Sequence, residues 1–247
     1  MVRTIFVAFV VFGYIFLAGP YCVLHAVLRR SPNILYSAGR VGCRLGLKLA
    51  GIRVVVRGLC HVEARKTYLF LANHQSYCDP PALVASIPGN ARLILKKELR
   101  KLPMLGLIME MGGFVFINRK DRAHSIDSMK QAVRQLRRGE SFLIYPEGTR
   151  TRTGRLGPFK KGPFIMAIES GVPIVPISVS GGYEIMPPDR LSIKPGTISV
   201  TFHPAIETKS LALEHREELM GRVRTTIAAD LDEPGSLSLE AVHTERT

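Results

Sequence analysis

An uncharged stretch of 25 residues near the N-terminus constrains this chain more than any other feature. The run from Thr4 to Leu28 contains no Asp, Glu, Lys or Arg, and it is bounded by Arg3 and by the pair Arg29-Arg30. As a single helix it would be about 37 Å long, enough to cross a hydrocarbon core of about 30 Å. The segment is therefore predicted to associate with a membrane.

Pro20 leaves two arrangements of this segment open. Proline lacks a backbone N–H and kinks or ends a helix. The part from Thr4 to Gly19 would reach only about 24 Å, so the sequence allows either a kinked span or a shallow re-entrant helix. A cleaved signal peptide is disfavoured, because only one Arg precedes the apolar run, the run is too long, and no A-x-A-like site follows.

A second helix is predicted over residues 34–51, and it is amphipathic. Arg40, Arg44 and Lys48 follow one another at intervals of four and share one face. This is typical of an interfacial helix lying in the headgroup layer, and the alternative is a surface helix with a solvated basic stripe. The positive-inside bias places everything after Arg29 on the cytoplasmic face, at a cell inner membrane or plasma membrane.

The charge of the chain points to an anionic partner. The 247 residues include 34 Lys and Arg against 20 Asp and Glu, a formal net charge of +14, and the first 62 residues hold eight basic residues and no acidic one. A phospholipid surface, a nucleic acid and a phosphorylated or CoA-bearing substrate all fit. Nucleic acid is disfavoured because Trp is absent and aromatic residues make up only 7%.

The cysteines predict neither a disulfide framework nor a metal site. The four Cys residues show no CxxC or Cys/His metal spacing. A reducing compartment fits this usage best.

From residue 52 on, short β-rich runs alternate with helical patterns, which predicts an α/β fold with a mostly parallel central sheet flanked by helices. The predicted strands are Ile52–Arg57, Thr67–Ala72, Leu93–Lys96, Phe114–Ile117, Ser141–Tyr145, Pro173–Val179 and Thr197–Phe202. The predicted helices are Pro81–Ile87, Leu99–Met111, Arg122–Arg138, Phe164–Ser170 and Leu211–Asp230. The chain thus divides into a membrane segment (1–51), one α/β domain (52–230) and a flexible, weakly hydrophobic tail (231–247).

The loop after the second predicted strand carries a candidate base. His74 is followed five residues later by Asp79, and a loop that turns back would let the carboxylate hold Nδ1 and leave Nε2 free as a general base. The alternative is structural: Asp79 would cap a helix that begins at Pro80-Pro81. The spacing alone does not decide between the two.

Two other strand ends carry basic residues. The run from Tyr145 to Arg150 follows an apolar strand, with a Pro and a Gly that turn the chain and a guanidinium suited to phosphate. The basic run of residues 151–162 that follows favours anion binding over a solvated turn. Arg119 is a second candidate anion ligand, and in isolation it would count as an ordinary residue at a strand end.

Together these motifs resemble the glycerolipid acyltransferases, and most closely the bacterial 1-acyl-sn-glycerol-3-phosphate (lysophosphatidate) acyltransferases. The resemblance covers roughly residues 52 to 205, and the segment from Lys97 to Gly106 also looks like theirs. Asn118 stands where many members have Asp, and Tyr77-Cys78 is not the commonest filling of the first block. Four ordered blocks carry the resemblance: Asn73-His74-x-Ser76-x-x-Asp79, Phe116-Ile117-Asn118-Arg119, Tyr145-Pro146-Glu147-Gly148-Thr149-Arg150 and Val172-Pro173-Ile174-Val175-Pro176.

The resemblance implies an acyltransferase of phospholipid biosynthesis. His74 would deprotonate the free sn-2 hydroxyl of a lysophospholipid, and Asp79 would stabilise the imidazolium. The hydroxyl would then attack acyl-CoA or an acyl-carrier protein thioester directly, with no acyl-enzyme. The expected partners are inner-leaflet phospholipid, the lysophospholipid acceptor and the acyl donor, with no bound cofactor, no metal and no nucleic acid.

The resemblance also implies roles for the neighbouring residues. The acceptor's phosphate would be bound by Arg150 and Arg119, in a pocket shaped by Glu147 and Gly148. The full set implied for the phosphate is Arg119, Glu147, Gly148, Thr149 and Arg150, and the supporting residues are Asn73, Ser76 and Lys97.

Two alternatives remain open. The acceptor could be another lysolipid, such as lyso-ornithine lipid, because the basic surface does not separate these acceptors. The chain could also be a non-catalytic module that binds anionic lipid, although mere binding does not need both His74 and Asp79. A serine hydrolase is disfavoured because no GxSxG motif is present.

Overall fold

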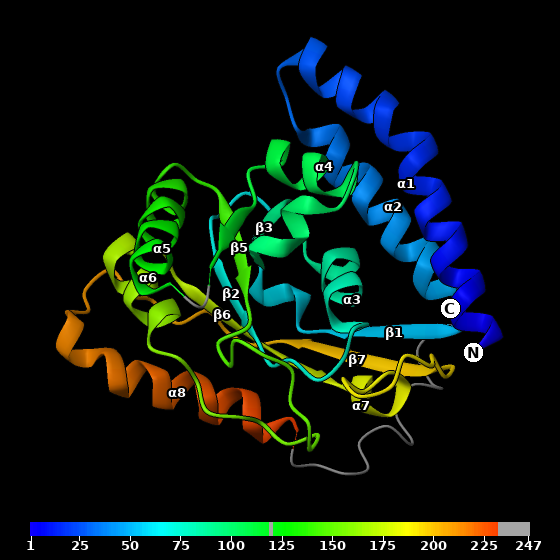
Figure 1. The fold of residues 1–247 in the computed structure, drawn as a ribbon. Coiled ribbons are helices and arrows are strands. Elements are labelled where there is room, and N and C mark those ends of the chain that lie inside the picture. The colour runs from blue at the N-terminus through cyan, green and yellow to red at the C-terminus, as the bar shows by residue number, and fades with distance from the viewer. Residues whose placement is uncertain (119–120, 232–247) are drawn as a thin grey trace, which may run out of the picture.

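A single mixed sheet forms the centre of the molecule. The computed structural model describes residues 1–118 and 121–231, apart from the side chain of Arg122, and Figure 1 shows helices on both faces of the sheet. Seven described strands lie in the order β1-β7-β6-β2-β5-β3-β4. Neighbouring strands run parallel except β6 and β7, which are antiparallel. The strands are β1 (Ile52–Arg57), β2 (Leu69–Ala72), β3 (Ala91–Lys96), β4 (Val115–Ile117), β5 (Ser141–Ile144), β6 (Ile174–Ser180) and β7 (Gly196–Phe202).

The predicted α/β class and mostly parallel sheet are confirmed. Each predicted strand is present, with bounds within two residues of the prediction. The predicted flexible tail, residues 231–247, lies outside the described residues after Leu231.

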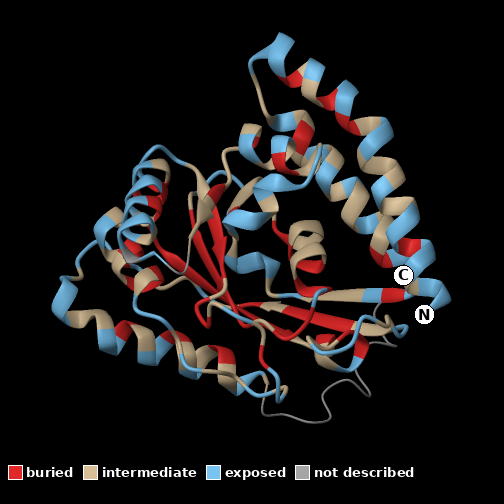
Figure 2. Cartoon of the chain, in the orientation of Figure 1, coloured by how far each residue is buried: buried red, intermediate tan, exposed pale blue. Residues whose placement is uncertain are grey.

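Helices enclose a separate apolar core on each face of the sheet. Phe70 and Ala72 of β2 belong to the core under α1, α2 and α3, whereas Leu69 and Leu71 belong to the core under α5, α6 and α8. Figure 2 shows the buried central strands between these layers. Because both faces are covered, β2 is apolar at every position. The helices are α1 (Val2–Arg29), α2 (Asn33–Leu49), α3 (Asp79–Ser86), α5 (Arg122–Arg137), α6 (Gly162–Ser170) and α8 (Arg216–Ala229).

The shorter helical pieces depart from the predicted pattern. The predicted helix Leu99–Met111 divides into a 3₁₀ helix (Lys97–Lys101) and α4 (Leu105–Met111), because Pro103 between them has no backbone N–H to donate. Helix α7 (Gly182–Ile185) was not predicted, since Gly181-Gly182 has the composition of a turn. The remaining 3₁₀ helices of the described residues are Leu59–His61 and Leu213–His215.

Helix α1 is continuous through Pro20 and lies along the rest of the protein. Near its start, the hydroxyl of Thr4 accepts a hydrogen bond from the N–H of Ile193 (2.9 Å). Midway, Gly19 lies against Met104, and near its end Ala26 packs in a cluster with Leu35. The start of α1 therefore contacts the α/β domain, and its end contacts α2.

The outer face of α1 is exposed (Figure 2), and many of its exposed side chains are large and apolar. Within the described residues, α1 is the one helix long and apolar enough to cross a membrane by length and composition. An exposed apolar surface of this extent marks a site of contact with lipid or protein. The exposed side chains include Ile5, Phe6, Phe9, Phe12, Phe16, Leu17, Leu24 and Leu28.

The basic stripe of α2 is partly engaged inside the protein. Arg40 donates to the carbonyl of Gly89 (2.6 Å) and to Asn90 Oδ1 (3.2 Å). Arg44 donates to the carbonyl of Ala85 at the end of α3 (3.3 Å). The interfacial role of α2 stays a prediction, but two of the three side chains expected to face headgroups tie the helix to the domain instead.

Candidate active site

Two loops meet at the carboxyl edge of the sheet. Strands β2 and β5 are parallel neighbours, with Leu71 opposite Ile144, so the loops that follow them emerge side by side, where ligands bind in open α/β sheets. The N–H of Thr151 donates to the carbonyl of His74 (2.9 Å). The loop of His74 and the loop of Arg150 are therefore joined through their backbones.

His74 and Asp79 form a hydrogen-bonded pair. His74 Nδ1 lies 2.9 Å from Asp79 Oδ2, and the Asp79 side chain is fully buried. The carboxylate accepts, so Nδ1 carries the proton and Nε2 keeps a free lone pair. The N-cap position of α3 is occupied by Cys78 and not by Asp79. The Asp79 carboxylate instead bonds His74 and the loop before the helix, so the structure favours the dyad over the capping alternative.

The loop between the two residues is folded around the same carboxylate oxygen. The backbone N–H groups of Gln75 (2.6 Å) and Ser76 (2.7 Å) also donate to Asp79 Oδ2. Three donors on one oxygen compensate for the loss of water around a buried charge. The turn that the dyad requires is thus built around the carboxylate itself.

Tyr145 stacks on the imidazole of His74. The ring centroids are 3.9 Å apart and the rings are 17° from parallel. Burial, with a smaller contribution from the charge of Asp79, raises the pKa of the Tyr145 hydroxyl well above its usual value, so the phenol stays neutral. With Tyr145 against one face and Asp79 at Nδ1, the orientation of the His74 ring is fixed.

Asn73 and Ser76 tie the catalytic loop to its surroundings. The Asn73 amide donates to the carbonyl of Val179 and accepts from its N–H, both at 2.7 Å, as a neighbouring strand would. Ser76 Oγ donates to the carbonyl of Met186 (2.8 Å) and accepts from the N–H of Cys78 (3.1 Å). Their geometry fits the supporting role expected of them.

Cys78 is unsuited to act as a nucleophile. It is buried, and burial raises the pKa of its thiol to about 11. The thiolate is the reactive form, so at neutral pH this thiol is a small side chain that fills space in the core.

Glu147 joins the two loops from within. Its Oε1 accepts from the N–H of His74 and its Oε2 from the N–H of Gly157, both at 2.8 Å. Burial raises the pKa of this carboxyl, against the opposing effect of the two hydrogen bonds. Both oxygens are thus engaged by backbone, which suits a residue that shapes a pocket rather than one that touches an anion.

Other predicted site residues are Gly148, Thr149, Lys97 and Arg119. Gly148 has a positive φ of 72° and a Cβ there would lie 2.8 Å from Lys160 Cε. Thr149 is exposed. Lys97 is exposed at the carboxyl end of β3, which pairs with β5. Arg119 lies outside the described residues.

Arg150 has a buried guanidinium nitrogen, Nη1, without a partner in the described part of the chain. The buried carboxylates of the two loops bond elsewhere: Glu147 accepts through both oxygens and Asp79 through Oδ2, while Asp79 Oδ1 has no partner among the described residues. A buried N–H without a partner is unfavourable, so this position suits a bound anion.

Tyr77, Tyr145 and Gly182 make contacts that the sequence left unassigned. The Arg150 Cζ lies 3.4 Å from the centre of the Tyr77 ring, and a Cβ on Gly182 would lie 2.5 Å from Asp79 Oδ1. Tyr77 and Tyr145 fall inside the motif blocks, which is the one signal that could have found them. Gly182 lies far from its partner in sequence, and no local pattern marks it.

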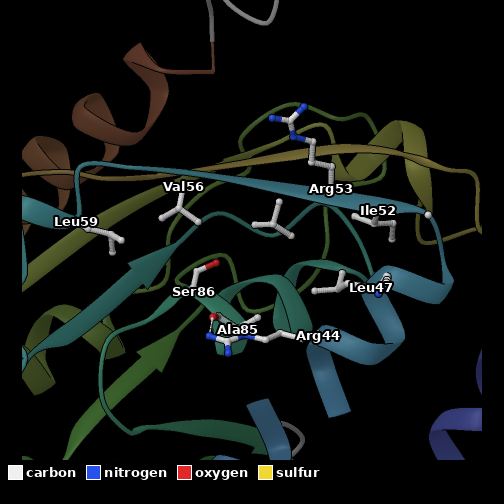
Figure 3. A pocket seen from close by; sticks show the side chains of 11 residues that line it. Arg44, Leu47, Ile52, Arg53, Val56, Leu59, Ala85 and Ser86 are labelled. Carbon is white, nitrogen blue, oxygen red and sulfur yellow. Dashed lines mark hydrogen bonds between the residues drawn. The ribbon is translucent and has the colours of Figure 1, made fainter. Parts of the chain in front are cut away.

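A cleft lies away from the dyad. It has a volume of about 620 Å³ and lies between α2, β1 and the end of α3 (Figure 3). Ala85 and Ser86 line it, whereas Asp79 is at the other end of α3, about 10 Å along the helix. Figure 3 also shows the Arg44 side chain reaching across to Ala85. The candidate active site is therefore located by the dyad and not by this cleft.

No metal-binding cluster is found in the described residues. Within residues 1–118 and 121–231, no group of three or more His, Cys, Asp or Glu side chains is placed to hold a metal ion.

The fold and the site define an α/β protein in which a histidine oriented by a buried carboxylate lies one loop away from an arginine whose Nη1 has no partner among the described residues. Comparison with known sequences identifies the family. The sequence model of the Acyltransferase family matches residues 53–180, more than half of the chain. The chain belongs to this family.

Relatives of known function share one description. A chloroplast 1-acyl-sn-glycerol-3-phosphate acyltransferase of Brassica napus is 36% identical over 153 residues, 61% of this chain and 44% of the relative. The human 1-acyl-sn-glycerol-3-phosphate acyltransferase alpha is 33% identical over 177 residues, 71% of this chain and 62% of the relative. The chain thus spans less than two thirds of the length of these curated relatives.

A solved structure agrees over nearly the whole chain. The 1-acyl-sn-glycerophosphate acyltransferase PlsC of Thermotoga maritima superposes with a TM-score of 0.84 and 25% identity, covering 93% of both chains. The likeness includes the N-terminal helices as well as the sheet, because the match extends well beyond the residues of the family model.

Replacement of Gly182 by Ala is expected to displace Asp79 from His74, although residue 182 is far from both in the sequence. The new Cβ would lie 2.5 Å from Asp79 Oδ1 and 3.0 Å from Ser76 Cβ, so the carboxylate must move. We expect kcat to fall at least ~10-fold, because small displacements of catalytic groups carry large costs in rate. The matched control is Gly221→Ala in α8, where a Cβ meets nothing within 4 Å. Wild-type kcat in Gly182→Ala would show that Asp79 is not held as described.

Proposed function

We propose that this chain transfers a fatty acyl group from acyl-CoA or an acyl-carrier protein to the free sn-2 hydroxyl of 1-acyl-sn-glycerol-3-phosphate, forming phosphatidic acid. One observation carries the proposal: the 2.9 Å contact between His74 and Asp79 lies in a loop joined to the one that presents Arg150. The printed descriptions of the curated relatives, 1-acyl-sn-glycerol-3-phosphate acyltransferases, support the same acceptor.

The reaction follows from the orientation of His74. Nε2 takes the proton of the acceptor hydroxyl while the hydroxyl oxygen attacks the thioester carbonyl carbon. The tetrahedral intermediate collapses with cleavage of the C–S bond, and the imidazolium returns its proton to the leaving thiolate. Asp79 stabilises the imidazolium through Nδ1–H and need not itself be protonated. The chain's own residues supply base and acid, and no acyl-enzyme forms.

The acceptor is recognised through its phosphate. The Arg150 guanidinium can donate two parallel N–H groups to phosphate oxygens, the geometry that makes arginine selective for such groups. Glu147 contributes indirectly, because its two backbone bonds fix the loop that presents Arg150. Arg119 is proposed as a second phosphate ligand on the basis of its motif alone.

The N-terminal helix is proposed to hold the enzyme on one leaflet of the membrane. Its outer face exposes large apolar side chains, while both of its ends contact the protein. A perpendicular span would carry one end across the bilayer, away from the domain. The active site would lie at the cytoplasmic face, where acyl thioesters are found and where the lysolipid is embedded.

The attachment can be tested by labelling cysteines in sealed inside-out vesicles. Cys60 is exposed on the domain and Val2 is 82% exposed at the start of α1. A membrane-impermeant maleimide added outside the vesicles is expected to label Cys60 in the native chain. It should also label the thiol introduced by Val2→Cys in a Cys60→Ser background. Protection of position 2 until detergent is added, with Cys60 accessible, would instead show a span.

The base is tested with purified protein, lysophosphatidate and labelled acyl-CoA or acyl-carrier protein. We expect His74→Ala to lower kcat by about 100-fold or more, the usual contribution of a general base. The matched control is His61→Ala, which alters an exposed histidine of the 3₁₀ helix after β1 and should leave kcat within about twofold. Undiminished turnover by His74→Ala would refute the mechanism.

The proposed role of Arg150 in binding phosphate is tested by measuring the KM for each of the two substrates. Arg150→Ala should raise the KM for lysophosphatidate about 10-fold or more, since hydrogen bonds to charged groups are worth about 1.5–3 kcal/mol. The KM for the acyl donor should change little. Arg152→Ala, at an exposed arginine of the same loop, is the control. An unaltered acceptor KM in Arg150→Ala would remove this residue from the binding site.

A further inference from the structure

Tyr77 lies between the two catalytic residues in sequence and against the anion-binding residue in space. It lies in the loop between His74 and Asp79, and its side chain is 42% exposed. The Arg150 Cζ is 3.4 Å from the centre of its ring. This is van der Waals contact of a guanidinium with an aromatic face, well inside the ~6 Å over which such cation–π pairs attract.

Stacking on the Tyr77 ring restrains the Arg150 guanidinium. Within residues 1–118 and 121–231, no hydrogen bond or ion pair of this guanidinium is found, and Nη1 is buried without a partner. An unrestrained arginine side chain samples many rotamers, and binding an anion then costs conformational entropy. Contact with the Tyr77 ring removes part of that freedom before any ligand arrives.

The backbone holds the two side chains in register. Glu147 Oε1 accepts from the N–H of His74, and the N–H of Thr151 donates to the His74 carbonyl. Gln75 Nε2 donates to the carbonyl of Gly154 (3.1 Å). These bonds join the two residues shortly before Tyr77 to residues on both sides of Arg150, so the contact between the two side chains lies between two connected loops.

The tyrosine stacks on the guanidinium and does not occupy the N–H edge with which arginine binds anions. The N–H donors of arginine lie in the plane of the group, and a phosphate engages them edge-on. The tyrosine covers a face and not the edge. The ring can therefore orient the group without competing with the anion.

We propose that Tyr77 is a positioning residue that orients Arg150 toward the phosphate of the acceptor. This proposal rests on the proposed function, because it concerns the same acceptor. Tyr77 acts through Arg150 and takes no part in proton transfer or in binding the acyl donor.

The test compares Tyr77→Leu with Tyr77→Phe in steady-state assays with lysophosphatidate and an acyl thioester. Leucine keeps an apolar side chain but has no aromatic face, whereas phenylalanine keeps the face and loses only the hydroxyl. In Tyr77→Leu, we expect the KM for lysophosphatidate to rise about fivefold, the measure of one cation–π contact. The kcat and the donor KM should stay within about twofold, and Tyr77→Phe should retain wild-type values.

The coupling is measured in the Arg150→Ala background. There, Tyr77→Leu should raise the acceptor KM no further, because non-additivity of this kind identifies two residues that act as one unit. The matched control is Tyr183→Leu. Tyr183 donates to the carbonyl of Arg152 (2.8 Å) and its ring packs beside Gly154 of the same loop, so this variant loosens the loop without removing the stack.

Three results with Tyr77 would overturn the proposal. They are an acceptor KM in Tyr77→Leu within twofold of wild type, an equal loss in Tyr77→Phe, and a full additional loss in the Arg150→Ala background. A rise in acceptor KM of the same size in Tyr183→Leu would also overturn it, by assigning the effect to the loop rather than to the stack. If the wild-type chain does not acylate lysophosphatidate at all, the proposed function itself fails, which no result with Tyr77 alone would show.

Discussion

The buried carboxylate of Asp79 is the constraint on which the rest of the site depends. A fully buried charge is tolerated only when its lost hydration is replaced. Here one oxygen receives the N–H groups of Gln75 and Ser76 together with Nδ1 of His74. Satisfying that oxygen folds the loop, and the folded loop in turn determines where His74 lies. The position of His74 therefore follows from the hydrogen bonds that the buried Asp79 carboxylate accepts in place of water.

Glu147 repeats this principle in the loop after the neighbouring strand, β5. It too is a buried carboxylate whose oxygens accept backbone N–H groups, one of them from His74 itself. The two acids thus lie on either side of His74, one through its ring and one through its backbone. Each of the two carboxylates restricts the movement of the histidine. Tyr145 completes the arrangement by covering one face of the ring.

A feature could be predicted from the sequence when the residues that determine it are close together in the chain. Strands such as β2 and β6 were predictable because their apolar runs are local, and the loops at their ends followed from the rules of parallel sheets. The dyad was predictable only as one of two alternatives, since the spacing of His74 and Asp79 does not say which way the carboxylate turns. Gly182 was not predictable, because its role is an approach to Asp79 from more than a hundred residues away. The contacts of Arg40 with the residues after α3 were missed for the same reason.

Helix α1 also contributes side chains to the core of the protein. Val7 is buried in the same apolar cluster as Leu47, Ile52 and residues of the central strands. A version of the enzyme trimmed before residue 30 would therefore lose more than its means of attachment. It would open one side of the core to water and expose Leu47 and its neighbours, which favours aggregation over solubility. Removal of α1 would therefore disturb the core as well as the proposed membrane attachment.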